Sequence, residues 1–324
     1  MHYENGIPTK PSVCIVTLNW NSSSDTLAFL ESLKNLRYDN YHTLVIDNNS
    51  NEIDYENLRL HSKDVELIRS EYNLGFAGGC NKGAEHAFSS GHEYVWFVNN
   101  DAKVDPDSLS SLIEFQVEKQ SGITSPIILN YDDSTIQHAV TFYDVERSEI
   151  KESLSLDDTN YKGCNNRLVI VWGTALLINK ETYMKIGGFD EGFFAYMEDF
   201  DLCLRAQKAN ISVSVAPKSS VHHNAHRGIR PAHYFYYTTR NGVLFWYRHA
   251  KNLRCFIRVL RWTLVNSAKS LNNQNRDAIF LAYWHLFIGI RGEYDNEQRA
   301  PIVIRTFLNV LFKALRKLIY KEKN

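Results

Sequence analysis

Three short apolar runs in the first third of the chain each end in asparagine or aspartate. They are VCIVTLNW from residue 13, YHTLVIDNNS from residue 41 and EYVWFVNNDA from residue 93. Runs without polar alternation are typical of strands that are buried on both faces of a parallel sheet. Segments with helical spacing, DTLAFLESLKNL and CNKGAEHAFSSG, lie between them. This alternation predicts an α/β fold with a mostly parallel sheet covered by helices.

The polar ends of the predicted strands indicate where a ligand binds. In open α/β sheets ligands bind beyond the carboxyl ends of the strands. Asn19, Asp47 and Asp101 stand at three such ends. We therefore expect these side chains to converge on one crevice.

The rest of the chain is less regular. Residues 130–165 are polar and are expected to form a long loop or small insert. Residues 168–210 predict a strand, a helix, a Gly-Gly turn, an aromatic run and an acidic helix start, and residues 213–224 predict a final strand. We expect a catalytic domain over residues 1–240 and a helical region over residues 241–324.

Composition excludes several classes of protein. With 324 residues, 44% of them hydrophobic, the chain can bury a sizeable core, and a net charge of -1 argues against nucleic acid as a partner. The five cysteines form no C-x-x-C pair, which favours reduced thiols and disfavours a zinc site. No signal peptide and no apolar run of about 18 residues is found, so we expect a cytoplasmic protein without a membrane span.

The stretch NLGFAGGCNKGA, residues 73–84, is rich in glycine but matches no phosphate-binding fingerprint. It is not G-x-G-x-x-G, and it lacks the G-K-[ST] of a P-loop. The first strand-to-helix turn, NWNSSSD, also lacks the glycines of a dinucleotide site. A nicotinamide oxidoreductase is therefore disfavoured, although Asp47 ends the second strand as such an enzyme requires. The local alternative is a tight turn with close helix packing.

Asp101 is a candidate metal ligand. Mg²⁺ prefers oxygen ligands and is often held by one or two carboxylates together with substrate phosphates. The alternative is that Asn99, Asn100 and Asp101 only form a turn. The VHHN sequence at 221–224 adds two histidines near a strand end, although a lone histidine is more often structural than a ligand.

The segment FFAYMEDFDLCLR contains a candidate general base. Glu198 and Asp199 begin a predicted helix, where acids suit the helix dipole. Asp199 shares a helix face with Leu202 and Cys203 and is expected to point inward, whereas Glu198 and Asp201 are expected on other faces. A buried carboxylate is costly unless it has a partner or a function. Burial also raises its pKa toward working pH, as a general base requires.

These motifs, in this order, resemble the inverting GT-A-type glycosyltransferases of family 2 and, within them, the rhamnosyltransferase-like bacterial enzymes. The resemblance covers about residues 12–245. It includes VTLNWN, VIDNNS, NLGFAGGCNKG, FVNNDA, GTALLINKETYMKIGGFDEGFFAYMEDFDLCLR, VHHN and YYTTRN. It implies a GT-A fold, in which helices flank a mostly parallel mixed sheet, with a C-terminal helical extension.

The resemblance also implies a donor site and a metal site. Nucleotide-sugar-binding positions of the family match Thr17, Asn19, Asp47, Asn73, Gly75, Phe76, Gly78, Asn81, Asn99 and Asn100. The family's D-x-D motif matches Asn99-Asn100-Asp101, in which asparagine replaces the first acid. Asp101 and His222 are then expected to bind Mg²⁺ or Mn²⁺, weakly when the nucleotide sugar is absent.

On the acceptor side the resemblance makes Asp199 the general base of a single inverting displacement. The other acceptor-side positions are Trp172, Gly173, Thr174, Phe194, Tyr196 and Glu198. The expected reaction transfers L-rhamnose from dTDP-rhamnose to a hydroxyl of a glycan or lipid-linked acceptor in cell-surface polysaccharide synthesis. The alternatives are a UDP-hexose or UDP-N-acetylhexosamine transferase of the same family, and an inactive glycan- or nucleotide-binding homologue.

Two C-terminal segments, residues 252–271 and 301–324, combine apolar residues at helical spacing with arginines and lysines. Basic amphipathic helices can lie in an anionic membrane surface, which predicts peripheral contact with the cytoplasmic face of the inner membrane. The alternatives are that the apolar stripes pack on the catalytic domain or form a homodimer.

Overall fold

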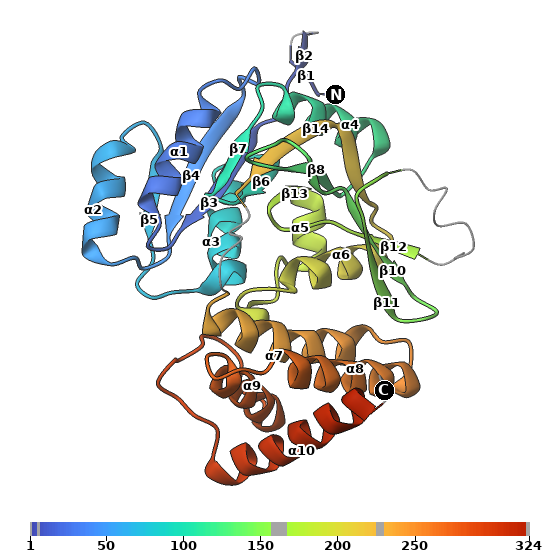
Figure 1. Cartoon of the computed structure of the whole chain (residues 1–324). Helices are drawn as coiled ribbons and strands as arrows, with labels where there is room; N and C mark the ends of the chain where they lie inside the picture. The colour runs from blue at the N-terminus through green and yellow to red at the C-terminus, as the bar shows by residue number, and fades with distance from the viewer. Residues whose placement is uncertain (1, 5–6, 157–166, 225–229, 322–324) are drawn as a thin grey trace. The chain divides into compact units, whose positions relative to one another are not determined.

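The computed structural model of the chain describes residues 2–4, 7–156, 167–224 and 230–321. The chain forms two compact units, which are drawn in Figure 1. The first unit holds Met1–Asp144, Glu149–Asp190 and Glu198–His226, and the second holds Val145–Ser148, Glu191–Met197 and Arg227–Asn324. The functional division expected between residues 1–240 and 241–324 stays a prediction.

A nine-stranded mixed sheet forms the centre of the first unit. Its order is β5-β4-β3-β6-β13-β8-β14-β7, and β9 pairs with β8. The strands are β3 (Val13–Asn19), β4 (Tyr41–Asp47), β5 (Glu66–Arg69), β6 (Tyr94–Val98), β7 (Ala102–Val104), β8 (Ile123–Asn130), β9 (Ile136–His138), β13 (Ala175–Asn179) and β14 (Val213–His223). Strands β5, β4, β3 and β6 are mutually parallel, so the predicted α/β sheet is confirmed.

Helices cover both faces of this sheet because its central strands are apolar on both sides. They are α1 (Ser23–Leu33), α2 (Glu52–His61), α3 (Gly75–Ser89), α4 (Ser108–Lys119), α5 (Lys180–Ile186) and α6 (Glu198–Lys208). Phe29 of α1 and Leu109 of α4 belong to one buried cluster with Ile15 of β3. Helix α3 packs on the opposite face, where Gly83 meets Val16.

Glycines let α3 approach the sheet closely. A Cβ atom at Gly83 would lie 2.4 Å from Cγ1 of Val16, and one at Gly79 would lie 3.0 Å from Leu18. The close helix packing predicted for the glycine-rich stretch is therefore confirmed, and the helix begins earlier than the sequence indicated, at Gly75.

Residues 130–165, expected to form a long loop or small insert, contribute strands to a small separate sheet. A three-stranded antiparallel sheet has the order β11-β10-β12, with β10 (Val140–Asp144), β11 (Glu149–Ser153) and β12 (Arg167–Ile170). Strand β11 is partly or fully exposed along its length, so its sequence lacks the apolar run of a central strand. Residues 157–166 lie outside the described part of the chain. A short hairpin of β1 (His2–Glu4) and β2 (Ile7–Thr9) precedes the main sheet.

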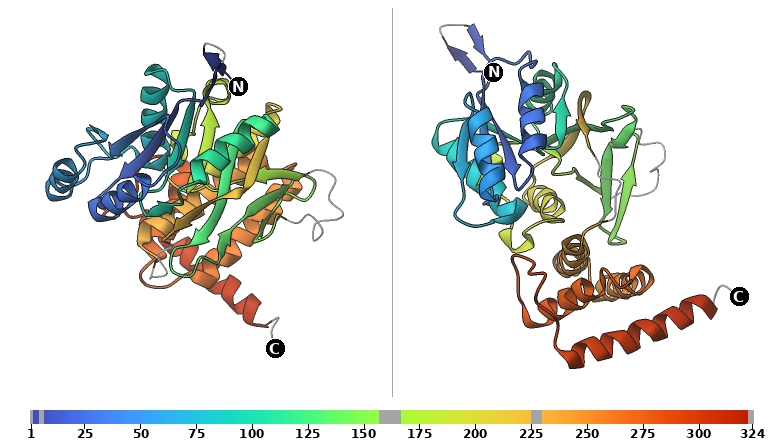
Figure 2. Two further views of the ribbon diagram at one scale, coloured as in Figure 1. Left: turned by 90° about the horizontal axis from the view of Figure 1, so that it is seen from above. Right: turned by 60° about the vertical axis from the view of Figure 1, so that its left-hand side comes forward.

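The second unit is helical. It contains a 3₁₀ turn, η2 (Glu191–Phe193), and the helices α7 (Ala232–His249), α8 (Leu253–Ser270), α9 (Arg276–Ile288) and α10 (Ile302–Lys321). Figure 2 draws α10 in red beside the orange helices of the same unit. Phe280 and Phe312 are buried between α9 and α10, and Tyr236 and Leu281 between α7 and α9. In the described residues, no helix combines the length and apolar character needed to cross a membrane.

Candidate active site

The ends of β3 and β4 meet in a buried polar network. Parallel register sets Asn19 directly beside Asp47, and both are 0% exposed. The Asn19 amide donates to Asp47 Oδ1 at 2.9 Å, Asp54 Oδ2 at 2.8 Å and Ser50 Oγ at 3.0 Å. Its carbonyl oxygen accepts from Thr26 Oγ1 at 2.8 Å. The predicted convergence is thus present for these two strand ends, and their contact with a nucleotide stays a prediction.

Arg69, at the end of β5, was not singled out in the sequence. Its Nε atom lies 3.6 Å from Oδ2 of Asp47, and its Nη1 donates to Glu52 at 2.9 Å. Its guanidinium also stacks 4.0 Å from the centre of the Tyr55 ring. The signal that could have found it is its position opposite Asp47 in the parallel register. Thr17 precedes Asn19 by two residues in β3 and so lies on the same face of the strand. Its hydroxyl is buried without a hydrogen-bond partner in the described structure.

Asn48 fixes the turn that leads into α3. Its amide donates to Oδ1 of Asn73 and to the carbonyl of Gly75, both at 2.9 Å, and its Oδ1 accepts from the Leu74 N–H at 2.9 Å. Gly75 adopts φ 71°, a conformation that favours glycine. Gly78 is buried in the first turn of the helix. The residues of the predicted donor stretch are therefore held at a helix N-terminus, where anions are favoured.

Asn81 is used to hold another segment. Its amide donates to the Phe189 carbonyl at 2.9 Å, and its Oδ1 accepts from the Phe189 N–H at 2.9 Å and the Tyr183 hydroxyl at 3.2 Å. This makes Asn81 a positioning residue for the Gly-Gly turn. The direct donor contact expected for it stays a prediction.

Arg205 holds the same Gly-Gly turn from α6. It donates to Asp201 Oδ2 and to the carbonyls of Ile186 and Gly188, each at 2.6 Å. Buried Asp201 thus has a charged partner, which offsets the cost of its burial. The Asp201–Arg205 pair thus gives a structural role to one acid and the one arginine of the GGFDEGFFAYMEDFDLCLR block.

Asp101 faces His223 across the β7–β14 pair. The Nε2 atom of His223 lies 3.3 Å from Oδ1 of Asp101, and that oxygen is buried without a hydrogen bond in the described structure. His222 instead lies 3.3 Å from Asp105. The structure thus places His223, and not His222, beside Asp101, because neighbouring strand residues point to opposite faces. Metal binding by Asp101 and His222 stays a prediction.

The environment of Asp101 fits a hard divalent cation. Nδ1 of His223 lies 2.8 Å from Oε1 of Gln137, an acceptor, so Nδ1 can donate to Gln137 while Nε2, which faces Asp101, can act as a ligand atom. One carboxylate and one imidazole leave positions for substrate oxygens, as Mg²⁺ and Mn²⁺ sites commonly do. Among the residues that the structure describes, no third His, Cys, Asp or Glu completes a metal-binding group.

The asparagines before Asp101 connect it to neighbouring elements. The Asn100 amide donates to Thr26 Oγ1 at 2.8 Å. The Asn99 N–H donates to the Thr174 carbonyl at 2.9 Å, so the tip of β6 is tied to the start of β13. Both asparagines are partly exposed. They are therefore within reach of a ligand while they hold the turn.

Asp199, in the first turn of α6, is partly accessible and is held by two backbone amides. Its Oδ2 accepts from Gly173 and its Oδ1 from Phe200, each at 2.8 Å. Burial raises the pKa of Asp199 to about 6, although these hydrogen bonds lower it. A Cβ atom at Gly173 would lie 3.3 Å from the Phe76 ring and 3.5 Å from Oδ2 of Asp199. The structure thus brings Phe76, Gly173 and Asp199 together.

Glu198 is more deeply enclosed than Asp199. It is 5% exposed, and its Oε2 has no hydrogen bond in the described structure. Burial, together with the charges of Asp199 and Asp201, holds the pKa of Glu198 well above its usual range. Glu198 and Asp201, which were expected on other faces of the helix than Asp199, are buried as well. Helix α6 is covered on more than one side, by α5, β12 and β14.

Trp172 stacks on His138, with ring centres 4.1 Å apart and planes 15° from parallel. His138 is buried, and burial lowers its pKa to about 3, so the ring is neutral. Its role as a platform for Trp172 could not be read from the sequence, because it lies in the region expected to be a loop.

Phe194 and Tyr196 belong to the second unit. Phe194 stacks on Tyr237 at 5.3 Å, and both Phe194 and Tyr196 adopt positive φ, 66° and 68°. Asn241 stabilises this strained segment, since its amide donates to the carbonyls of Phe193, Ala195 and Tyr196 at 2.7 to 2.9 Å. Strained backbone of this kind is concentrated at functional sites.

Comparison with known proteins agrees with the motifs. Residues 12–187 match the model of the family "Glycosyl transferase family 2", and residues 155–227 match "N-terminal domain of galactosyltransferase". The chain is 27% identical over 278 residues to an N-acetylglucosaminyl-diphospho-decaprenol L-rhamnosyltransferase of Mycobacterium tuberculosis, covering 78% of this chain and 89% of that protein. It is 23% identical to the dTDP-rhamnosyl transferase RfbF of Shigella flexneri, covering 85% and 97%.

Two further matches cover less of the other protein. The hexosyltransferase Agl10 of low-salt glycan biosynthesis in Haloferax volcanii is 24% identical, and the match covers 65% of this chain and 66% of Agl10. A crystal structure of GalNAc-T7 with UDP, GalNAc and Mn²⁺ superposes with a TM-score of 0.53 at 16% identity, over 71% of this chain and 48% of that one. This likeness supports the expected GT-A fold. The family model spans more than half of the 324 residues, so the chain belongs to glycosyl transferase family 2 and is a glycosyltransferase.

Proposed function

We propose that this glycosyltransferase moves L-rhamnose from dTDP-rhamnose to a hydroxyl of a lipid-linked or other glycan acceptor, in the synthesis of a cell-surface polysaccharide. The names of two relatives that align over most of their length support this donor. The name of the mycobacterial relative supports an N-acetylglucosaminyl diphospho-polyprenol as the acceptor class.

The observation that carries the proposed chemistry is the environment of Asp199. Its carboxylate is partly accessible, packed against Gly173 and near Phe76, and has a pKa of about 6. Near neutral pH it is ionised and still basic enough to accept a proton, as a general base must be. Glu198 is too enclosed to reach an acceptor and stays protonated.

The reaction is a single displacement. Asp199 accepts the proton of the acceptor hydroxyl while that oxygen bonds to the anomeric carbon. The bond from the anomeric carbon to the diphosphate oxygen breaks, and its electron pair leaves with dTDP. Attack opposite the leaving group inverts the anomeric configuration, and no covalent enzyme intermediate forms.

Asp101 and His223 would hold Mg²⁺ or Mn²⁺, with Gln137 fixing the imidazole tautomer. When bound, such an ion supplies Lewis-acid stabilisation of the developing diphosphate charge. Asn73, Gly75, Phe76 and Gly78 hold the donor at the N-terminus of α3, where the helix dipole also favours the diphosphate. Thr17, Asn19, Asp47, Asn99 and Asn100 contribute to the nucleotide side of the site.

On the acceptor side, Trp172, with its ring stacked on His138, Gly173 and Thr174 line the approach to Asp199. Phe194 and Tyr196 offer aromatic surface for a sugar ring.

A donor panel tests the proposed substrate. The purified protein is incubated with Mn²⁺ and a short-chain N-acetylglucosaminyl diphospholipid, and with dTDP-rhamnose, UDP-glucose or UDP-N-acetylglucosamine. Transfer from dTDP-rhamnose is expected. Transfer from a UDP sugar alone would replace the proposal with the hexosyltransferase function that the name of Agl10 suggests. Tight donor binding without transfer to a wide set of acceptors would indicate an inactive homologue.

A further inference from the structure

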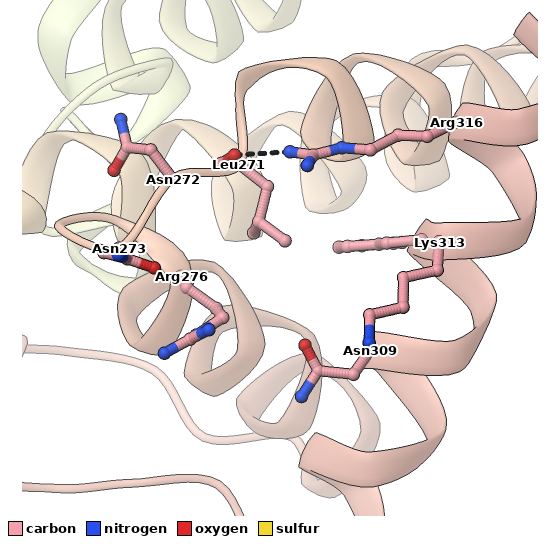
Figure 3. A pocket seen from close by; sticks show the side chains of 8 residues that line it. Leu271, Asn272, Asn273, Arg276, Asn309, Lys313 and Arg316 are labelled. Carbon is pink, nitrogen blue, oxygen red and sulfur yellow. Dashed lines mark hydrogen bonds between the residues drawn. The ribbon is translucent and has the colours of Figure 1, made fainter. Parts of the chain in front are cut away.

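A basic pocket lies in the helical unit, far along the chain from the residues assigned to sugar transfer. Its volume is about 130 Å³, and it is open to solvent. Its walls come from the turn after α8, the start of α9 and the middle of α10, as Figure 3 shows. The lining residues are Leu271, Asn272, Asn273, Arg276, Asn309, Phe312, Lys313 and Arg316.

The pocket is strongly cationic. Three of its eight lining residues are arginine or lysine, and none is aspartate or glutamate. Arg316 is anchored, since it donates to the carbonyls of Ala268 and Leu271; Figure 3 shows the bond to Leu271. Arg276 and Lys313 form no ion pair within the described part of the chain. The acid next in sequence, Asp277, is engaged by Arg299 at 3.1 Å and Arg305 at 3.5 Å. Among the described residues, the pocket therefore has no acidic partner.

The other polar groups of the pocket also suit an anion. The amides of Asn272, Asn273 and Asn309 add hydrogen-bond donors beside the three cations. Helix α9 begins at Arg276, so its partial positive charge lies at the same place. Guanidinium, ammonium and amide donors together form the chemistry that binds phosphate.

An exposed apolar stripe runs along α10 next to this pocket. Val303, Phe307 and Val310 are 73%, 62% and 64% exposed, and exposed Ala314 continues the spacing i, i+4, i+7, i+11. We call these four residues the α10 stripe. The opposite side of α10 packs in the core through Leu308 and Phe312, which are 5% and 1% exposed. Helix α10 is thus apolar on two sides: the side with Leu308 and Phe312 is buried, and the α10 stripe is exposed to solvent.

The positive charge beside the α10 stripe indicates what kind of partner can cover the stripe. Lys313, which is one of the three cations of the pocket, and Lys317 are exposed along the edge of the α10 stripe. A symmetric dimer through this face would bring the same cations together, and like charges opposed in this way are costly. A bilayer with anionic headgroups offers apolar depth for the stripe and negative charge for its edge.

We propose that the basic pocket and the α10 stripe form a docking surface for an anionic lipid bilayer, with a lipid phosphate in the pocket. Val303, Phe307, Val310 and Ala314 enter the boundary between headgroups and acyl chains. Arg276, Lys313 and Arg316 hold the phosphate. This inference does not depend on the proposed donor or acceptor.

Flotation of the full chain tests the proposal. The protein is mixed with vesicles of phosphatidylcholine, or of phosphatidylcholine with phosphatidylglycerol, and binding to the second kind alone is expected. The double variant Arg276→Gln/Lys313→Gln should bind about 30-fold more weakly, since each basic residue near an anionic surface contributes roughly a factor of five. Lys63→Gln/Lys185→Gln, which removes two exposed lysines of the first unit, is the matched control and should bind like the wild type.

A second pair of variants tests the α10 stripe. Phe307→Ser should weaken vesicle binding about 10-fold, because the variant lacks the aromatic surface that the wild type transfers from water into the bilayer. Ile53→Ser, at an 86% exposed position of α2, is the control and should have no effect. Circular dichroism checks that all variants keep their helix content.

Three outcomes would overturn the proposal. Equal vesicle binding by the wild type and the Arg276/Lys313 variant would show that the pocket does not contribute to membrane binding. A rise in melting temperature with inorganic phosphate that needs Arg276 and Lys313, without vesicle binding, would make the pocket a site for free phosphate. If the protein instead forms a concentration-dependent dimer that Phe307→Ser abolishes, and does not bind vesicles, the α10 stripe would be a dimer interface.

Discussion

Asp199 and Glu198 are adjacent acids with different environments. Asp199 is accessible enough to meet a substrate and is held by two backbone N–H groups, whereas the Glu198 carboxyl is enclosed. Two neighbouring buried carboxyls rarely ionise together, so the better solvated one keeps the charge. The pair therefore has one base and one neutral acid near pH 7.

Replacement of each acid by its amide separates their roles. Asp199→Asn should lower kcat about 10²- to 10⁴-fold, because no group remains to accept the acceptor proton. Glu198→Gln should change kcat much less, since glutamine has the shape of the protonated acid already present. The measurement is steady-state transfer, with donor binding as the control, which neither change should affect strongly. A larger loss of kcat in Glu198→Gln than in Asp199→Asn would mean that Glu198, and not Asp199, is the general base.

The pH dependence of the reaction follows from the raised pKa of Asp199. A general base acts when deprotonated, so kcat/KM should rise with pH and level off above the pKa, which burial sets at about 6. The acid limb should disappear from the residual activity of Asp199→Asn. An acid limb centred near 4, the ordinary carboxyl range, would indicate that Asp199 is not the titrating base.

The two histidines of β14 offer a direct comparison of metal ligands. His223→Ala should weaken binding of Mn²⁺ in the presence of dTDP, and His222→Ala should not, because His222 faces Asp105. Gln137→Leu should weaken it about 10-fold, since the residue that orients a ligating histidine usually affects affinity by that amount or more. Electron paramagnetic resonance of free Mn²⁺ measures each affinity without any need for turnover. A loss of Mn²⁺ affinity in His222→Ala but not in His223→Ala would support His222 as the metal ligand, as the sequence predicted.

At the scale of elements, helix α3 depends on its glycines. Gly83→Ala should lower the free energy of unfolding by about 1–3 kcal/mol, because the new methyl group overlaps Val16 on β3. Gly242→Ala is the matched control in α7. Apart from its own helix backbone and chain neighbours, no atom of the described residues lies within 4 Å of its added Cβ, so alanine should stabilise the protein by about 0.5–1 kcal/mol through helix propensity. Urea denaturation measures both, and equal effects would mean that α3 does not need this close approach.

The central strands were predictable from sequence because burial on both faces leaves an unbroken apolar run. Val13 to Val16 are at most 1% exposed, and β3 lies where the sequence indicated. Strand β11 was missed because all five of its residues are at least partly exposed and form no such run. Strand β10 is mostly buried, but its sequence VTFYD includes a threonine and an aspartate and so gives no continuous apolar run. The inward position of Asp199 followed from helical spacing, whereas the burial of Glu198 and Asp201 depends on the several elements that cover α6.

Residues that hold other residues were the hardest to predict. Asn48, Arg69, Arg205 and Asn241 act through hydrogen bonds to segments distant in sequence, and only the fold reveals those partners. The choice of His223 over His222 depends in the same way on the register of β14 against β7. Sequence motifs therefore predicted a candidate site, and the tertiary structure shows which of its residues lie side by side.

At the scale of the whole molecule, the two units carry separable proposals. The α/β unit holds Asp101, His223 and Asp199, and the helical unit holds the basic pocket and the α10 stripe. Loss of vesicle binding with transfer to a short-chain acceptor intact would support membrane docking as a separate property of the helical unit. It would leave the transferase proposal unchanged.

The stereochemistry of transfer tests the central claim most directly. Proton NMR can follow dTDP-β-L-rhamnose with a short-chain acceptor, for the wild type and for Asp199→Asn. The wild type should release dTDP and form an α-linked rhamnoside, and Asp199→Asn should form it at least about 100-fold more slowly. A β-linked product, or equal rates for the two proteins, would contradict an inverting displacement with Asp199 as its base.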